Sequence, residues 1–213
     1  MPIDYRARLA AEKCWDRRTE SLLARHGEPL EDGILQSREE LIALCELIER
    51  KRIRSYLEIG IWTGRLVSAL HRMFRFDIVA VCDHRYAARF GLPISVPPET
   101  RAFWGDSGSE GYHRFRRELG PIDLVLIDAN HSHAGVLRDF QINRAYPHRF
   151  LAFHDILGGR ASTRGVRTFW DRLEDGYRLE LVRSHREVGL ERSLMGIGVW
   201  SAQENPANPA QPV

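Results

Sequence analysis

The sequence predicts a mixed α/β fold with a mostly parallel sheet, an antiparallel edge strand and helices that precede the sheet. From Ser55 onward, short apolar runs alternate with segments of helical spacing, which is typical of a parallel sheet covered on both faces. Two strand-like segments near the end, Tyr177–Ser184 and Leu194–Ser201, favour an antiparallel pair at one edge. The length of 213 residues fits a single structural core.

Two helices are expected before the sheet. Asp4–Arg25 carries apolar residues at helical spacing among charges, which indicates an amphipathic helix. A second helix should begin at Ser37, because Ser37 and Glu40 have the spacing of a capping box and could each satisfy a backbone donor of the first turn. We expect residues 1–50 to form an N-terminal helical cap on a domain spanning 51–202.

Within residues 51–202, β-branched runs predict strands and 3.6-residue periodicity predicts helices. The expected parallel strands are Tyr56–Ile59, Asp77–Cys82, Arg101–Trp104, Ile122–Ile127 and Phe150–Phe153. The expected helices are Leu66–Met73, Gly111–Leu119, Gly135–Tyr146 and Gly165–Leu173. Residues 203–213 hold three prolines and no aromatic residue, so we expect a disordered tail.

Composition excludes several classes of partner. The net charge of +2, from 31 basic and 29 acidic residues, gives no electrostatic case for nucleic acid. No apolar run approaches the roughly 20 residues of a membrane span, and the first residues lack a signal-peptide pattern, so we expect a cytoplasmic protein. Cys14, Cys45 and Cys82 share no metal-binding spacing and are expected to be reduced thiols. A homo-oligomer stays open.

An acidic residue stands at or beside the end of each of the five expected parallel strands. Ligands of open parallel sheets bind beyond the carboxyl ends of the strands, so these side chains should share one rim. The strand ends carry Glu58, Asp83, Asp106 with Ser107, Asp128, and His154 with Asp155. We interpret this rim as the functional site.

The first turn of the expected sheet runs Glu58-Ile-Gly60-Ile-Trp-Thr-Gly64. Gly60 and Gly64 lack a Cβ atom and could let a ligand approach the backbone closely. The turn lacks the third glycine of a dinucleotide-binding G-x-G-x-x-G motif and the Lys-Ser/Thr of a P-loop. It suits a ligand that has an amino group and no pyrophosphate.

The segment Tyr56–Gly64 resembles motif I of class I methyltransferases, and the resemblance extends from about Gln36 to Trp200. It implies a Rossmann-like fold and S-adenosylmethionine as cofactor. By this resemblance Asp83 would bind the ribose hydroxyls and Asp106 and Ser107 the adenine. Glu58 and Gly60 would lie in the methionine-binding region, and Gly64 and Asp128 would complete the cofactor site.

The closest resemblance is to small-molecule O-methyltransferases, a subgroup that includes macrolide-sugar enzymes and cephalosporin-hydroxylase-like proteins. It is carried by Asp123–His133, Phe153-His154-Asp155 and Gly165–Trp170. The resemblance implies a divalent metal, most simply Mg²⁺, on Asp128 and Asp155, and His131 as general base for an acceptor hydroxyl. His154 stands where the sugar enzymes often carry Glu. Because Mg²⁺ prefers oxygen ligands, a histidine there favours Mn²⁺ or Fe²⁺ or lies outside the metal shell.

The resemblance therefore predicts methyl transfer to a hydroxyl of a small-molecule acceptor. Two alternatives stay open, namely a metal-independent methyltransferase acting on nitrogen or a carboxylate, and a non-catalytic S-adenosylmethionine-binding protein. Trp62, Trp104 and Tyr112 are further candidates for the pocket wall.

Overall fold

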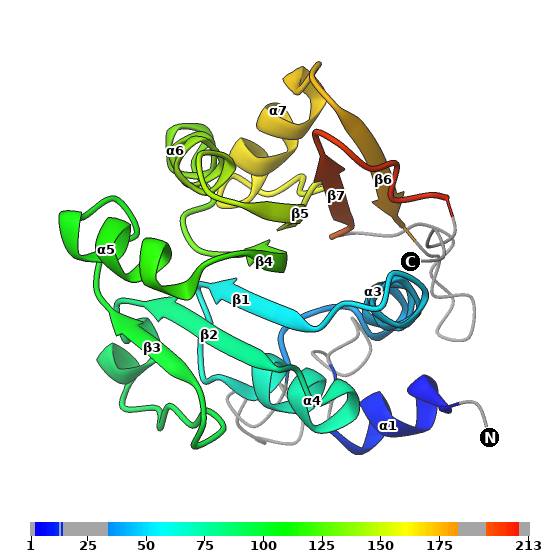
Figure 1. The fold of residues 1–213 in the computed structure, drawn as a ribbon, viewed down its shortest axis with the longest axis vertical. Coiled ribbons are helices and arrows are strands. Elements are labelled where there is room, and N and C mark those ends of the chain that lie inside the picture. Colours follow the sequence, from blue (N-terminus) through cyan, green and yellow to red (C-terminus); the bar gives the residue numbers. More distant parts are fainter. Residues whose placement is uncertain (1–2, 13, 15–33, 183–194, 209–213) are drawn as a thin grey trace.

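Seven strands form one sheet in the order β3-β2-β1-β4-β5-β7-β6 (Figure 1). The structure is a computed structural model that describes residues 3–12, 14, 34–182 and 195–208. The strands are β1 Ser55–Ile59, β2 Ile78–Asp83, β3 Arg101–Trp104, β4 Ile122–Ile127, β5 His148–His154, β6 Tyr177–Leu181 and β7 Ile197–Ser201. Each of the five parallel strands lies within two residues of its predicted position.

Strands β1 to β5 are parallel, and β7 runs antiparallel between β5 and the edge strand β6. This confirms the predicted parallel sheet with an antiparallel edge. The strand order reverses between β1 and β4, so the ends of these two central strands flank the position where open sheets of this kind bind ligands.

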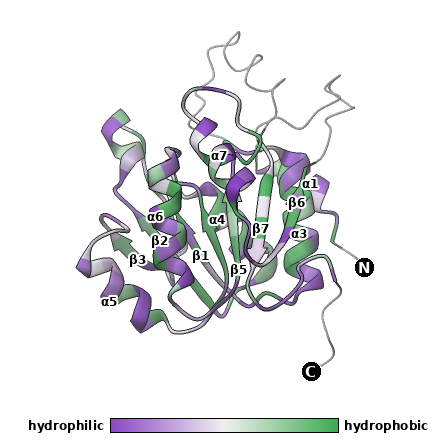
Figure 2. Cartoon of the chain, turned by 90° about the horizontal axis from the view of Figure 1, so that it is seen from above, coloured by the Kyte–Doolittle hydropathy of each residue, from purple (hydrophilic) through white to green (hydrophobic). Residues whose placement is uncertain are grey.

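Helices cover both faces of the sheet, as a parallel sheet requires. They are α1 Tyr5–Ala11, α3 Arg38–Arg50, α4 Arg65–Phe74, α5 Glu110–Leu119, α6 His133–Arg144 and α7 Arg164–Arg172, with a 3₁₀ turn η2 at Tyr86–Phe90. Apolar residues of α1, α3 and α4 share one core cluster on one face, and those of α5, α6 and α7 share a second cluster on the other. The core strands are largely hydrophobic, whereas the outer helix surfaces are hydrophilic (Figure 2).

The N-terminal prediction is confirmed only in part. α1 begins at Tyr5 after an Asp4 cap, but most of the predicted Asp4–Arg25 helix lies outside the described residues. Ser37 does cap α3, yet its side chain makes no capping hydrogen bond, so the predicted capping box is wrong. Glu40 instead points inward and is fully buried. The helices α1 and α3 belong to the same core as the sheet strands.

The predicted disordered tail is wrong for residues 203–208. The carboxylate of Glu204 bonds to the ammonium of Lys51 at 2.9 Å and to the guanidinium of Arg149 at 3.2 Å. These contacts tie the segment to the rim where β1 and β5 begin. Residues 209–213 lie outside the described part of the chain. Cys14, Cys45 and Cys82 are buried free thiols, as predicted. No described helix is long and apolar enough to cross a membrane.

Candidate functional site

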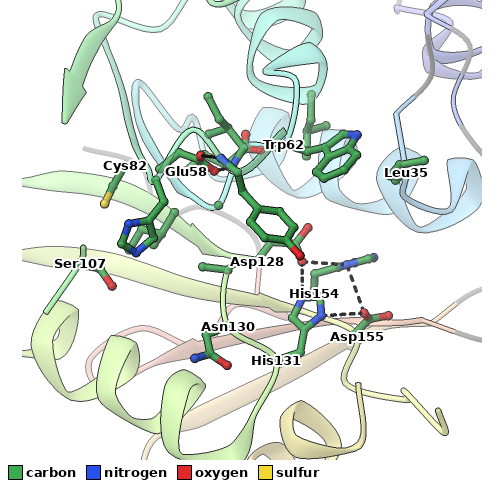
Figure 3. A pocket seen from close by; sticks show the side chains of 18 of the residues that line it. Leu35, Glu58, Trp62, Cys82, Ser107, Asp128, Asn130, His131, His154 and Asp155 are labelled. Carbon is green, nitrogen blue, oxygen red and sulfur yellow. Dashed lines mark hydrogen bonds and ion pairs between the residues drawn. The ribbon is translucent and has the colours of Figure 1, made fainter. Parts of the chain in front are cut away.

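A cavity of about 810 Å³ opens beyond the carboxyl ends of the parallel strands (Figure 3). Its volume falls in the range typical of small-molecule and cofactor sites. The loops after β1, β2, β3, β4 and β5 all contribute to its wall, together with the segment before α3. The lining includes the predicted residues Glu58, Gly60, Asp83, Asp106, Ser107, Asp128, His131, His154 and Asp155. The sequence therefore places these residues at one site, while Gly64 lies at the start of α4 next to it.

The turn after β1 is built by two glycines with left-handed backbone, Gly60 at φ 83° and Gly64 at φ 82°. A Cβ atom on Gly60 would lie 2.4 Å from the carbonyl oxygen of Asp128, and one on Gly64 would lie 2.3 Å from that of Ser95. The neighbouring backbone therefore leaves no room for a side chain at either position, whether or not a ligand is bound.

Asp83 accepts backbone hydrogen bonds from this turn and from the segment after β2. Its Oδ2 atom accepts the backbone N–H of Ile61 at 3.0 Å, and its Oδ1 atom accepts that of Tyr86 at 2.8 Å. Each carboxylate oxygen has a second lone pair, so both could still accept a ribose hydroxyl. The side chain is buried at the end of β2 and lines the cavity.

The turn after β3 carries a small polar network. The Ser107 hydroxyl donates to the buried carboxylate of Asp139 at 2.6 Å, and Arg138 lies 3.1 Å from Asp106. Asp106 also accepts the backbone N–H of Gly108 at 2.7 Å. Asp106 and Ser107 therefore face the cavity from a rigid turn that α6 supports. Sequence reasoning missed Arg138 and Asp139, which lie on the helix after the rim.

At the centre of the site, one carboxylate joins three other side chains. The Oδ1 atom of Asp128 bonds to Nε2 of His131 at 2.9 Å and to Nδ1 of His154 at 3.2 Å. Its Oδ2 atom accepts the side-chain amide N–H of Gln36 at 2.6 Å. The carboxylate of Asp155 lies 3.8 Å from the other nitrogen of His131. Figure 3 shows Asp128, His131, His154 and Asp155 converging on the cavity floor.

These contacts shift the acidity of the cluster. Burial alone would raise the pKa of Asp128, but the attraction of His154 and the hydrogen bonds from His131 and His154 lower it far below its usual range. Burial opposes protonation of His154, yet Asp128 and Asp155 raise its pKa to about 10. Burial lowers the pKa of His131, but the hydrogen bond to Asp128 and the attraction of Asp128 and Asp155 together raise it. Asp128 is therefore an anion that orients two imidazole rings.

The same geometry bears on the predicted metal. Two carboxylates and two imidazoles are suitable ligands for a transition-metal ion. Here, however, Asp128 is bonded to both histidines instead of sharing an ion with them. Over residues 34–182 and the other described stretches, no group of three or more His, Cys, Asp or Glu side chains is arranged to hold a metal. As they lie, these side chains do not fit a bound ion, which would have to displace the imidazole nitrogens from Asp128.

Backbone strain is found at the end of β5. Asp155 has a φ of 64°, which is a left-handed backbone conformation. Residues other than glycine rarely adopt it, and it costs on the order of 1–3 kcal/mol. It turns the chain sharply after His154, so that both side chains of the pair line the same cavity. Strain of this kind persists where the surrounding structure imposes it and is concentrated at functional sites.

Glu58 lies at the end of β1 and is fully buried, with its carboxyl group accepting the hydroxyl of Tyr56 at 2.8 Å. Burial raises its pKa to about 8, against the opposing effect of the Tyr56 hydrogen bond and with a further rise from Asp128 and Asp83. Glu58 is therefore mostly protonated near neutral pH. A cationic ligand group bound beside it would favour the ionised form.

The aromatic predictions have mixed outcomes. Trp62 lines the cavity and packs against Tyr86 and Phe90, with ring centroids 5.9 and 5.6 Å away. Trp104 is not part of the lining and lies under the guanidinium of Arg85. Tyr112 is a core residue whose hydroxyl donates to Asn143. Sequence reasoning thus placed one of the three correctly.

Two polar residues of the segment before and within α3 were not predicted at the site. Gln36 lines the cavity and is 4% exposed, and Glu40 is fully buried near His154. Burial raises the pKa of Glu40 to about 7. The sequence signal for Glu40 was its place on the buried face of α3, which the capping-box interpretation obscured. Gln36 carries no pattern that would single it out.

One family model matches the central part of the chain. Residues 57–156 match the family described as a methyltransferase domain. This range contains the turn after β1 and every rim acid from Glu58 to Asp155. No curated protein matches the sequence. Residues 57–156 are therefore a methyltransferase domain, as the motif I resemblance predicts.

Solved structures show the same fold at low sequence identity. A cofactor-bound protein, Rv0187 from MTB, is 19% identical with a TM-score of 0.55, over 90% of this chain and 92% of that chain. The O-methyltransferase from Bacillus cereus in complex with SAH is 15% identical with a TM-score of 0.52, over 94% and 92%. A third, the O-methyltransferase TomG from Streptomyces achromogenes in complex with SAM, is 15% identical with a TM-score of 0.50, over 94% and 100%. These likenesses establish the Rossmann-like methyltransferase fold.

Proposed function

We propose that this chain, in which residues 57–156 form a methyltransferase domain, transfers a methyl group from S-adenosylmethionine to a hydroxyl of a small molecule. The observation that carries the proposal is the bond between Asp128 and His131 on the floor of the cofactor-sized cavity. Solved structures of similar fold include O-methyltransferases described in complex with SAH or SAM, which supports the choice of cofactor.

The cofactor supplies a methyl group on a sulfonium, a leaving group that needs no activation. The protein must therefore position the acceptor and remove its proton. Asp128 is ionised and accepts from Nε2 of His131, which leaves Nδ1 as the nitrogen that can take the hydroxyl proton. As that proton moves to His131, the acceptor oxygen forms a bond to the methyl carbon and the carbon–sulfur bond breaks.

The other rim residues would bind and orient the cofactor. Asp83 would accept the ribose hydroxyls while holding Ile61 and Tyr86 in place. Asp106 and Ser107 would face the adenine from the turn after β3. Glu58 would lie near the methionine part with Gly60. These assignments rest on the motif resemblance and on the shared position of the residues in one cavity.

Metal assistance is a second candidate for acceptor activation, favoured by the two carboxylates and two imidazoles at the ends of β4 and β5. It stays a prediction, because these side chains are bonded to one another in the structure. A divalent ion would supply a Lewis acid that lowers the pKa of the acceptor hydroxyl. The proton transfer to His131 described above needs no such ion.

The test combines binding with turnover. Isothermal titration of the protein with S-adenosylhomocysteine, with and without EDTA, should show binding in both cases. A screen of hydroxylated metabolites with labelled S-adenosylmethionine should then identify acceptors, and turnover should persist in excess EDTA. Loss of turnover with EDTA, restored by Mg²⁺ or Mn²⁺, would establish the metal-assisted route instead. Absence of S-adenosylhomocysteine binding would refute the proposed function.

A further inference from the structure

The residue that the domain assignment leaves unexplained is Gln36, which lies outside residues 57–156. It precedes α3 and reaches the cavity from a part of the chain far from the rim in sequence. Its amide N–H group donates to Oδ2 of Asp128 at 2.6 Å, across 92 residues of sequence. Its side chain is thereby fixed, with the amide group directed at Asp128.

The other end of the same amide is unsatisfied. The Oε1 atom of Gln36 is buried and has no hydrogen-bond partner among the residues that the structure describes. An isolated buried carbonyl costs on the order of 1–3 kcal/mol, so proteins rarely leave one without a donor. Because Gln36 lines the cavity, a bound ligand can supply that donor.

From this geometry we infer that Gln36 binds the cofactor, its Oε1 atom accepting a hydrogen bond from the amino group of the methionine part. This inference rests on the proposed function. The acceptor hydroxyl has one proton, which goes to His131, so the hydroxyl cannot also donate to Gln36. The amino group of the cofactor carries several N–H donors.

The order of the strands supports the same ligand group. With adenine at the end of β3 and ribose at the end of β2, the cofactor extends toward β1 and β4. Gln36 is bonded to Asp128 at the end of β4, and Glu58 at the end of β1 lines the same cavity. Two carboxyl groups and an amide oxygen together form a suitable environment for an ammonium group.

The experiment compares two ligands that differ in the methionine part. S-adenosylhomocysteine carries the amino group, whereas 5′-methylthioadenosine lacks the whole amino-acid end and keeps the adenosine. Titration calorimetry on the full chain should show that Gln36→Met lowers the affinity for S-adenosylhomocysteine by roughly ten-fold or more. This is the loss expected for a hydrogen bond to a charged group. The affinity for 5′-methylthioadenosine should not change. Gln141→Met, on the exposed surface of α6, is the matched control.

A purely structural role for Gln36 gives a different result. If Gln36 serves only to hold Asp128, Gln36→Glu should bind S-adenosylhomocysteine more weakly than Gln36→Met does, because the glutamate places a second carboxylate beside Asp128. If Gln36 binds the amino group, Gln36→Glu keeps an acceptor oxygen and should bind S-adenosylhomocysteine more tightly than Gln36→Met does. The inference is overturned if Gln36→Met lowers the affinities for both ligands equally, or if it leaves the affinity for S-adenosylhomocysteine unchanged. Failure of the wild-type protein to bind either ligand refutes the proposed function instead.

Discussion

The Nε2 atom of His131 lies 2.9 Å from the Oδ1 atom of Asp128, so the carboxylate at the end of β4 fixes the imidazole that follows it by three residues. His131 immediately precedes Ser132, the N-cap residue of α6. The short loop lets the ring fold back over the strand end. Asp128 therefore leaves Nδ1 as the nitrogen of His131 that would take the proton in the proposed reaction.

Replacing His131 by alanine should slow methyl transfer without loss of cofactor binding. The acceptor would lose its base, and the rate should fall by roughly 10²–10⁴-fold. Single-turnover assays with an acceptor from the screen measure the rate, and calorimetry measures S-adenosylhomocysteine affinity. His133→Ala, at the start of α6 and outside the cavity lining, is the control. Unchanged single-turnover rates in His131→Ala would exclude it as the base.

Asp83→Ala should weaken S-adenosylhomocysteine binding. The expected loss is on the order of 1–3 kcal/mol, because the ribose loses its acceptor and the turn at Ile61 loses its backbone partner. Asp77→Ala is the matched control, since Asp77 precedes the same strand and pairs with Arg54 at the exposed opposite rim. Titration calorimetry of both variants decides the point. Equal affinities would show that the end of β2 does not bind ribose.

The stability of the protein should depend on pH through Glu58. Its pKa is about 8 in the folded state and about 4.5 in the unfolded chain. Between these values the unfolded chain ionises first, so the stabilising effect of the protonated carboxyl is complete below pH 4.5 and is lost as pH rises toward 8. The free energy of unfolding should fall by up to about 1.4 kcal/mol per pH unit in this window.

The variant Glu58→Gln isolates this effect, because glutamine keeps an acceptor for the Tyr56 hydroxyl and does not ionise. Urea unfolding at pH 5 and pH 8 should show that the variant gains stability relative to the wild type as pH rises. Parallel pH dependence of the two proteins would mean that Glu58 is already ionised in the folded state.

Gly60→Ala should destabilise the fold and the cofactor site together. Gly91→Ala is the matched control, because Gly91 also has a left-handed backbone, with a φ of 75°, but a Cβ atom there meets nothing within 4 Å. Each substitution should lower the free energy of unfolding by about 1–2 kcal/mol, because it places a Cβ atom on a left-handed backbone. The clash with the Asp128 carbonyl should add roughly 1–3 kcal/mol at Gly60. Equal free energies of unfolding in the two variants would show that the backbone there adjusts freely.

The sheet could be predicted because its signals are local. β3 and β4 match their predicted bounds, since the Gly-Asp turn after β3 and the Asp-Ala turn after β4 mark the carboxyl ends of these strands. The rim could be predicted because parallel strands bring their ends together. Residue-level contacts could not, because they join distant segments. Nothing near Gln36 in sequence indicates that it meets Asp128, and nothing near His154 shows that it turns toward the same carboxylate.

Prediction of the metal depended on residue types at matching positions, which do not determine whether side chains face an ion or each other. In the structure both histidines bond to Oδ1 of Asp128, and the Gln36 amide bonds to Oδ2, so the oxygens that a metal would need are already occupied. The tail was misjudged for a related reason. Its composition is typical of disorder, but the Glu204 carboxylate forms an ion pair with a cation next to the sheet, the ammonium of Lys51.

That cation, the ammonium of Lys51, has a side chain with no exposed surface and also lies over the ring of Phe150. A shortened chain ending at residue 202 would remove both the Glu204 carboxylate and the Asn205 carbonyl that accept hydrogen bonds from this ammonium. The consequence concerns protein production. A purification tag should follow residue 213, or be joined at the first residue, and should not replace 203–208. Such trimming would lower yield and melting temperature, even though the cofactor cavity lies at the far rim of the sheet.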